Sequence, residues 1–260
     1  MMGKVYLVGA GPGDPELLTL KALRVLQKAD VVLHDSLVSS EILKRIPEGV
    51  ERIDVGKRRG YRLLNQPEIH SLLVSLAGRH GVVVRLKGGD PLLFGRAAEE
   101  IQALREAAIE FEIVPGITAA FGAAAAMQVS LTDRALASNL LFTTFSRSPE
   151  AAELLRTGLT SDTTVVVYMP GIHYADVSEW LLEAGVPPST PCLVISRATL
   201  PNQLSKPSTA GDLAHLAPLP APAILIVGRT VRRDGSLGKA ADWFGNSSHT
   251  NSVTQGNLIS

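Results

Sequence analysis

Short runs of Val, Ile and Leu alternate with segments whose apolar residues recur at helical spacing, and this alternation constrains the fold more than any other feature. Continuous apolar runs are typical of strands buried on both faces, and strands that alternate with helices form parallel sheets. The first half of the chain is therefore predicted to form a parallel α/β sheet. The predicted strands are residues 4–8, 31–34, 52–55, 82–87 and 111–114, and the predicted helices are 15–27, 39–45, 67–77 and 96–107.

Two helix starts carry chemical markers. Asp14 can accept hydrogen bonds from N–H groups of the next turn, and Pro15 has the backbone φ of a first helical position. The pair Gln66-Pro67 predicts a second start.

The alternation restarts after Arg134, so we expect an α/β protein made of two α/β domains, residues 1–130 and 131–244. The final segment, residues 245–260, is polar and without pattern, which predicts a disordered tail. The strands expected in the second domain are residues 140–144, 164–169, 192–196 and 223–227, with a helix at 177–184.

Charge is balanced over the whole chain, with 25 Lys and Arg against 25 Asp and Glu in 260 residues. This balance argues against general nucleic-acid binding, which needs a basic excess. Residues 52–96 nevertheless carry a local surplus of six positive charges, which suits a small-molecule partner rich in carboxylates. The basic residues there are Arg52, Lys57, Arg58, Arg59, Arg62, Arg79, Arg85, Lys87 and Arg96, and the acidic ones are Asp54, Glu68 and Asp90.

Several features favour a cytoplasmic protein without a membrane segment or a bound metal. The single cysteine, Cys192, cannot form a disulfide within the chain, which favours a reducing compartment. The apolar run before Gly9 is too brief for a signal peptide. The longest stretch of small apolar residues, 116–129, is shorter than the roughly 20 residues that a membrane span requires. The histidines show no metal-ligand spacing.

A glycine-rich loop, residues 9–14, follows the first predicted strand. Such loops let the backbone approach a nucleotide and present N–H groups to it. The dinucleotide-binding pattern requires glycine where this chain has Asp14, and Pro12 lacks an N–H donor. Taken alone, the loop is equally compatible with ligand binding and with a tight strand-to-helix turn.

A second segment, residues 85–96, lies at the carboxyl end of a predicted parallel strand, where ligands bind in open α/β sheets. Its glycines, carboxylate and cations exceed what a connecting turn needs, which favours a functional role. Glu99 and Glu100 follow on the next helix, where they could simply complement the helix dipole. Asp35 ends the second strand at the same edge, and it could act as a general base or cap the following helix.

Together these segments resemble the uroporphyrinogen-III C-methyltransferase family, within the larger class of tetrapyrrole methylases. The resemblance extends over residues 3–230 and is dense only in the first 135. The pieces most specific to the uroporphyrinogen branch are residues 55–58 and 85–91. The segments on which the resemblance rests are residues 5–21, 29–32, 55–58, 84–91, 94–96 and 114–120.

The resemblance implies that S-adenosylmethionine (SAM) is bound in the cleft between two α/β domains, in a homodimer. It further implies methylation of uroporphyrinogen III at two pyrrole carbons, C2 and C7, which gives precorrin-2 via precorrin-1 for sirohaem and corrinoid synthesis. An electron-rich carbon that attacks the methyl group must later lose a proton, which gives Asp35 or a neighbouring group tuned by arginine a role as base. Uroporphyrinogen III is a polycarboxylate, which the basic surplus of residues 52–96 would suit.

Individual roles are carried over by matching positions. Asp35 and Lys57 match the family's acid/base pair, and Arg96, Arg134 and either Glu99 or Glu100 match its substrate contacts. The residues that match its SAM contacts are Pro12, Gly88, Gly89, Asp90, Leu93, Thr118, Ala119, Met169 and Ala198.

Departures from the family pattern gather in the second half. Asp133 stands where the family usually has histidine, and Arg197-Ala198-Thr199 replaces Asn-Gly-Thr. Two alternatives therefore accompany the main hypothesis: a methylase of a later precorrin intermediate, and a catalytically weakened protein that binds SAM or a tetrapyrrole. A nicotinamide oxidoreductase would rest on the glycine loop alone, and Asp14 argues against it.

Overall fold

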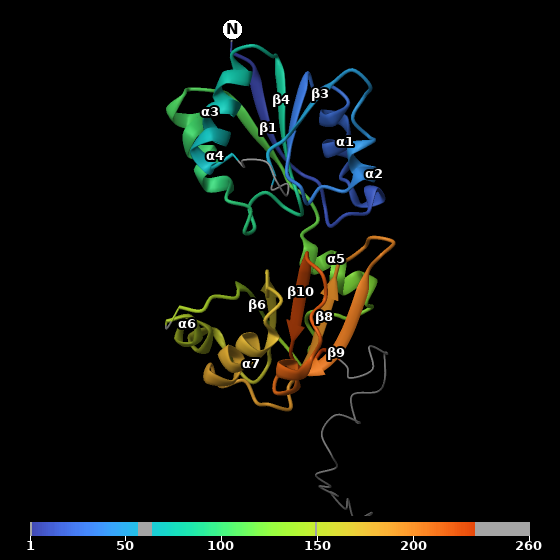
Figure 1. Cartoon of the computed structure of the whole chain (residues 1–260), viewed down its shortest axis with the longest axis vertical. Coiled ribbons are helices and arrows are strands. Elements are labelled where there is room, and N and C mark those ends of the chain that lie inside the picture. The colour runs from blue at the N-terminus through green and yellow to red at the C-terminus, as the bar shows by residue number, and fades with distance from the viewer. Residues whose placement is uncertain (1, 57–63, 149, 232–260) are drawn as a thin grey trace, which may run out of the picture.

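The computed structural model describes residues 2–56, 64–148 and 150–231. They form two lobes, each built on a five-stranded sheet and placed end to end (Figure 1). Lys57 and the rest of the basic segment up to residue 63 lie outside the described residues, as does the predicted tail at 245–260.

The first sheet is parallel throughout, in the order β3-β2-β4-β1-β5, as the alternation of the sequence predicts. Because parallel strands share one direction, all five carboxyl ends meet at one edge, and that edge faces the second lobe (Figure 1). The predicted strands are confirmed to within one residue at each end. The strands are β1 Lys4–Gly9, β2 Val31–His34, β3 Glu51–Asp54, β4 Val82–Lys87 and β5 Phe111–Val114.

Helices cover both faces of this sheet: α1 (Leu20–Leu26) and α2 (Ser40–Leu43) on one face, α3 (Gln66–Ala77) and α4 (Ala97–Glu106) on the other (Figure 1). Strand residues alternate between the two resulting cores. Burial of apolar strands from both sides explains why their sequences read as continuous hydrophobic runs.

The marked helix starts form, although the first one differs from the prediction. Asp14 accepts a hydrogen bond from the Glu16 N–H at 2.8 Å, but the turn it caps is a short 3₁₀ helix, Pro15–Leu17. Helix α1 begins separately at Leu20, where Thr19 caps it. At the second start, Asn65 and Glu68 form a reciprocal capping box around Pro67.

The second sheet has the order β6-β7-β10-β8-β9 and is mixed, because only β6 and β7 are parallel. The four strands predicted there are present. The sequence missed β9, since Pro207 and polar side chains give this edge strand the composition of a loop. The strands are β6 Asn139–Thr144, β7 Thr163–Tyr168, β8 Pro191–Ser196, β9 Leu204–Thr209 and β10 Ala223–Val227.

Three longer helices belong to the second half: α5 (Ala119–Ala126), α6 (Ala151–Gly158) and α7 (Tyr174–Glu183). The Ala-rich α5 buries Ala120 and Ala123 in the same core as β7, β8 and β10. It thereby connects the end of the first sheet to the face of the second. Helices α6 and α7, with a 3₁₀ turn at Asp212–His215, cover the opposite face.

Glycine backbones from three loops touch at the carboxyl edge of the first sheet. A Cβ atom placed on Gly9 would lie 2.5 Å from the Gly116 nitrogen, and one on Gly116 would lie 2.3 Å from the Gly89 carbonyl oxygen. Gly89 also has a φ of +68°, which favours glycine. The ends of β1, β4 and β5 can approach this closely only because no side chain separates them.

We expect Gly116→Ala to lower the free energy of unfolding by about 1–3 kcal/mol, since the new methyl group meets rigid backbone. Gly78→Ala is the matched control, because its Cβ would lie 3.4 Å from the nearest atom, the Ser75 oxygen. Urea denaturation of both variants checks this. Equal stability of the two variants would contradict the close packing described here.

Candidate active site

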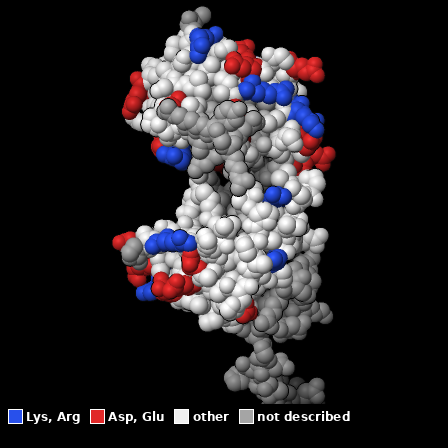
Figure 2. Space-filling view, viewed as in Figure 1, with Lys and Arg blue, Asp and Glu red and all other residues white. Residues whose placement is uncertain are grey.

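A cavity of about 320 Å³ lies between the two lobes, where the carboxyl edge of the first sheet faces the second sheet. The surface is hollowed there, and the walls of the hollow show few charged groups in this view (Figure 2). Ligand sites of this size and composition are typical of open α/β sheets at this edge. The first lobe lines it with Gly11, Pro12, Asp35, Leu37, Gln66, Ile69, Arg85, Lys87, Gly88, Gly89, Asp90, Leu93, Phe94, Gly95 and Arg96. Thr118, Ala119, Tyr168, Met169, Ile195, Ala198, Pro222, Ala223 and Ile224 complete the lining.

The structure brings together all the residues that the sequence matched to SAM contacts, and it adds Asp35 and Arg96 to them. They come from segments far apart in the chain, between Pro12 and Ala198. Arg134 is exposed and is not among the described residues that line the cavity.

The glycine loop is both a turn and a part of the cavity wall. Gly11 and Gly89 exchange backbone hydrogen bonds of 3.1 and 2.8 Å, which joins the loop to the segment after β4. The Asp14 N–H donates to Thr199 Oγ1 of the second lobe at 3.1 Å. Pro12 lines the cavity and offers no N–H to a phosphate. The loop therefore holds the two lobes together beside the cavity and does not form a phosphate cradle.

Asp90 fixes the shape of the adjoining part of the cavity wall. Its Oδ1 accepts from the Leu92 N–H at 2.8 Å, and its Oδ2 accepts from the Gly116 N–H at 3.0 Å. One carboxylate thus shapes its own loop and ties it to the loop after β5. This explains why an acidic residue follows the two glycines at 88 and 89.

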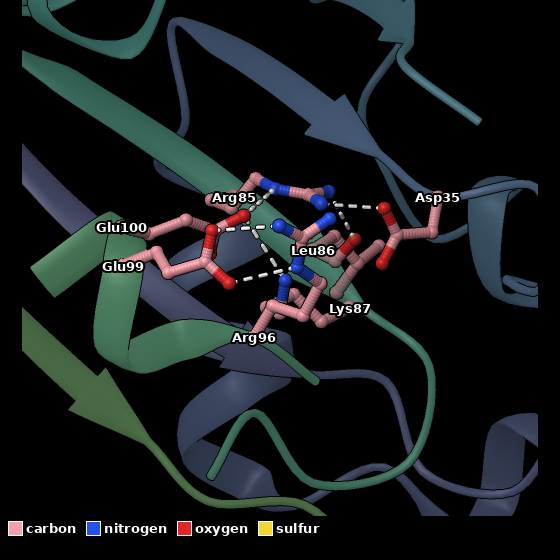
Figure 3. A network of polar contacts seen from close by, with 7 residues as sticks. All are labelled: Asp35, Arg85, Leu86, Lys87, Arg96, Glu99 and Glu100. Carbon is pink, nitrogen blue, oxygen red and sulfur yellow. Dashed lines mark hydrogen bonds and ion pairs between the residues drawn. The ribbon is translucent and has the colours of Figure 1, made fainter. Parts of the chain in front are cut away.

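A network of four charged groups connects three residues of the first-lobe wall, Asp35, Arg85 and Lys87, to Glu100 behind them (Figure 3). Arg85 lies between Asp35 and Glu100, and it donates to Asp35 Oδ1 and, from Nε, to Glu100 Oε1 at 3.0 Å. Lys87 Nζ donates to the same Glu100 oxygen, also at 3.0 Å. The side chains of Arg85, Lys87 and Glu100 are 3%, 4% and 0% exposed, whereas that of Asp35 is 28% exposed. Asp35 is therefore the member of the network most accessible to a ligand.

The environment perturbs Lys87 in particular. Burial lowers the pKa of its ammonium group, and the neighbouring Arg85 charge lowers that pKa further. The carboxylate of Glu100 opposes both effects. The second oxygen of Glu100, Oε2, is buried without a hydrogen-bond partner among the described residues.

These contacts bear on two pairs of alternatives left open by the sequence. Asp35 does not cap α2, because Ser39 occupies that role and the Asp35 carboxylate binds Arg85. Glu99 is exposed and binds Arg96 through both oxygens, at 2.8 and 2.7 Å, whereas Glu100 points into the protein. Of the two glutamates, Glu99 is the one placed beside a predicted substrate contact.

Strained backbone gathers around the cavity. Phe94, Arg96, Met169, Arg197 and Thr199 all have φ between +51° and +67°, a region that costs side-chain-bearing residues energy. Such strain is concentrated at functional sites in many proteins. The sequence gives no signal for it, because none of these residues is of a type that favours positive φ.

Two aromatic residues missed by the sequence also connect the lobes. The Phe94 ring lies 4.9 Å from the Tyr168 ring, measured between centroids. Tyr168 OH is 2.6 Å from Thr118 Oγ1 and accepts from the Ala120 N–H at 3.3 Å. Burial raises the pKa of the Tyr168 hydroxyl.

The departure at Asp133 has a local structural role. Its Oδ1 accepts from the N–H groups of Ala135 and Leu136, at 2.8 and 3.1 Å. This Asx-type turn shapes the exposed loop that carries Arg134.

Within residues 2–56, 64–148 and 150–231, no cluster of His, Cys, Asp and Glu is placed to hold a metal ion. No helix in the same part of the chain has the length and apolar character to cross a membrane.

Comparison with known proteins places these features in a family. The model of the Tetrapyrrole (Corrin/Porphyrin) Methylases matches residues 4–214. A uroporphyrinogen-III C-methyltransferase of Paracoccus denitrificans (strain Pd 1222) is 47% identical over 232 residues, which are 87% of this chain and 81% of the relative. A siroheme synthase of Psychrobacter sp. (strain PRwf-1) is 43% identical over 94% of this chain, which spans 50% of that relative.

Solved structures agree with the sequence comparison. The crystal structure of uroporphyrin-III C-methyl transferase from Thermus thermophilus, complexed with S-adenyl homocysteine, has a TM-score of 0.76 and 38% identity. The similarity covers 88% of this chain and 94% of that one, so it includes both lobes. On these matches, the chain belongs to the tetrapyrrole (corrin/porphyrin) methylase family.

Proposed function

We propose that this protein transfers methyl groups from SAM to C2 and C7 of uroporphyrinogen III, giving precorrin-2 via precorrin-1. The observation that carries the proposal is one cavity that brings the matched SAM residues of both lobes together with Asp35 and Arg96. The relatives from Paracoccus denitrificans and Thermus thermophilus are named as C-methyltransferases of uroporphyrinogen III and of uroporphyrin III, which supports this substrate class.

The cavity fits a ligand of the chemical character of SAM. Backbone at Gly88 and Gly89 is open to the cavity, and a Cβ on Gly88 would lie 3.2 Å from Leu37 Cβ, so a larger residue would crowd the wall. Leu93, Ala119 and Ala198 supply apolar surface. When bound, SAM supplies an electrophilic methyl group on a sulfonium and has no pyrophosphate, which agrees with Pro12 in the glycine loop.

Asp35 has the position of a proton acceptor at the cavity wall. Its carboxylate is partly exposed toward the cavity while Arg85 holds one oxygen from behind. A fixed carboxylate can take the proton that a methylated pyrrole carbon loses. Most of the remaining rate enhancement would come from holding the carbon in line with the methyl group.

Arg96 suits recognition of the substrate carboxylates. Its side chain is 61% exposed and lines the cavity, and Glu99 orients its guanidinium through two hydrogen bonds. An arginine fork binds a carboxylate with defined geometry. Arg134 would contribute from outside the described cavity wall. Lys57 lies outside the described residues, and we assign it the role of second member of the acid/base pair from its match to the family.

The proposed setting is a homodimer in the cytoplasm, as in the family that the sequence resembles. We expect light scattering to give twice the chain mass of 27.6 kDa. A mass equal to one chain would contradict the homodimer.

Incubation of the purified protein with SAM and freshly reduced uroporphyrinogen III tests the proposed reaction. Mass spectrometry is expected to find a monomethylated intermediate and a dimethylated product. Methylation of precorrin-2 in preference to uroporphyrinogen III would instead identify a later methylase. Stoichiometric SAM binding without any methylated product would identify a binding protein and overturn the proposed activity.

Asp35→Asn is expected to lower kcat about 100-fold and to leave the Kd for S-adenosylhomocysteine within twofold, because a general base contributes to chemistry more than to binding. Lys57→Ala is expected to show the same split. Steady-state kinetics and calorimetry measure the two quantities. Asp176→Asn, an exposed ion-pair residue on α7, is the matched control and should resemble the wild type. Parallel losses of kcat and of ligand affinity would count against these roles.

A further inference from the structure

Strand β4 places two cations on a face that is otherwise part of the hydrophobic core. Val83 packs in the core beneath α3 and α4. Residues 85 and 87 follow on the same face, since side chains of a strand alternate. Toward the carboxyl end of β4, this face therefore carries the aliphatic Val83, then the guanidinium of Arg85 and then the ammonium of Lys87. The side chains of Arg85 and Lys87 are at most 4% exposed.

Two buried cations require two anions to be neutral together. Asp35 supplies one and Glu100 supplies the other. Glu100 is fully buried on α4, on the helix face that also buries Ala97 and Leu104. It binds Arg85 and Lys87 through a single oxygen, so it joins the two cations at one point (Figure 3).

We propose that Glu100 is a positioning residue for the methyl transfer: it balances Lys87 and orients Arg85, and Arg85 in turn holds Asp35 at the cavity wall. Glu100 itself does not line the cavity. The proposal rests on the function proposed above, and it adds a residue that acts on Asp35 through Arg85.

Charge counting gives the physical reason. Without the Glu100 charge, Asp35, which binds Arg85, would be the one carboxylate left in this network, and Glu100 would no longer offset the repulsion between the buried Arg85 and Lys87 charges. Arg85 would then lose the contact that fixes its Nε, and the Asp35 carboxylate would lose its fixed orientation. A displacement of about 1 Å at a reacting group is enough to cost about 100-fold in rate.

The same counting predicts a rescue. Removing Lys87 and Glu100 together leaves one cation, Arg85, with one anion, Asp35. The double variant K87M/E100Q is therefore expected to keep the Arg85–Asp35 pair with its charges balanced. A role of Glu100 as a mere space-filling residue predicts no such recovery, since glutamine has nearly the same size and shape.

The experiment compares E100Q, K87M and K87M/E100Q with the wild type and with E106Q, an exposed glutamate near the end of α4 that serves as the matched control. E100Q should lower kcat about 100-fold with the KM for SAM within twofold, and the double variant should recover at least tenfold over E100Q. E106Q should match the wild type. E100Q activity within twofold of the wild type, or a double variant no more active than E100Q, would overturn the proposal.

A second readout does not depend on turnover. Urea denaturation of the wild type, E100Q, K87M and K87M/E100Q gives the coupling between Lys87 and Glu100, and K87M/E100Q is expected to be more stable than E100Q. This result holds whether or not the wild type methylates uroporphyrinogen III, so a failure of the proposed reaction can be told apart from a failure of the charge balance. Additive destabilisation by the two substitutions would contradict the charge balance even if E100Q were inactive.

Discussion

The contact between loop backbones at the carboxyl edge of the first sheet is the constraint on which the rest of the site depends. Gly9, Gly89 and Gly116 meet there without side chains, so the loops after β1, β4 and β5 form one continuous surface. Asp90 then links two of these loops by hydrogen bonds. The second lobe packs against this surface through Thr199 and α5, and the cavity is the space that remains between them.

The buried charges at the carboxyl edge of the first sheet lower the stability of the fold, and we attribute their presence to the function of the site. Burying an ion costs several kcal/mol of desolvation, which an ion pair recovers only when its geometry is good. Arg85 and Lys87 lie on the face of β4 that also carries the core residue Val83, and Glu100 lies on the buried face of α4 beside Leu104. Strained backbone at Phe94, Arg96 and Met169 adds to this cost at the same place. The energy needed for both comes from the hydrophobic cores on the two sheets.

Local patterns predict most of the first lobe, because strands that are buried on both faces have continuous hydrophobic sequences that are easy to identify. β2, β4 and β5 have the bounds that the sequence predicts. In the second lobe, β9 was not predicted because Pro207 and polar side chains give this edge strand the composition of a loop, and the short α6 was not predicted either. Ala-rich α5 carries almost no amphipathic pattern, since it is apolar on nearly all sides.

Site residues could be predicted where their motif resembles that of a family. They could not be predicted where tertiary packing alone determines whether a side chain is buried or lines the cavity. Matching positions located Asp35, Gly88 and Ala198, which are distant in sequence and line one cavity. No local pattern reveals that Glu100 is buried while Glu99 is exposed, although two cations spaced by one residue in a buried strand signal the need for an anion. Phe94 and Tyr168 were missed because their contact joins two lobes.

Structure determination of the protein with S-adenosylhomocysteine bound tests the central claim most directly, namely that both lobes hold the methyl donor in this cavity. The account predicts a ligand that contacts the segments at Gly88–Asp90 and Thr118–Ala119 from one side and Met169 or Ala198 from the other, with Asp35 still bound to Arg85. A ligand bound to one lobe alone, or outside this cavity, would contradict it.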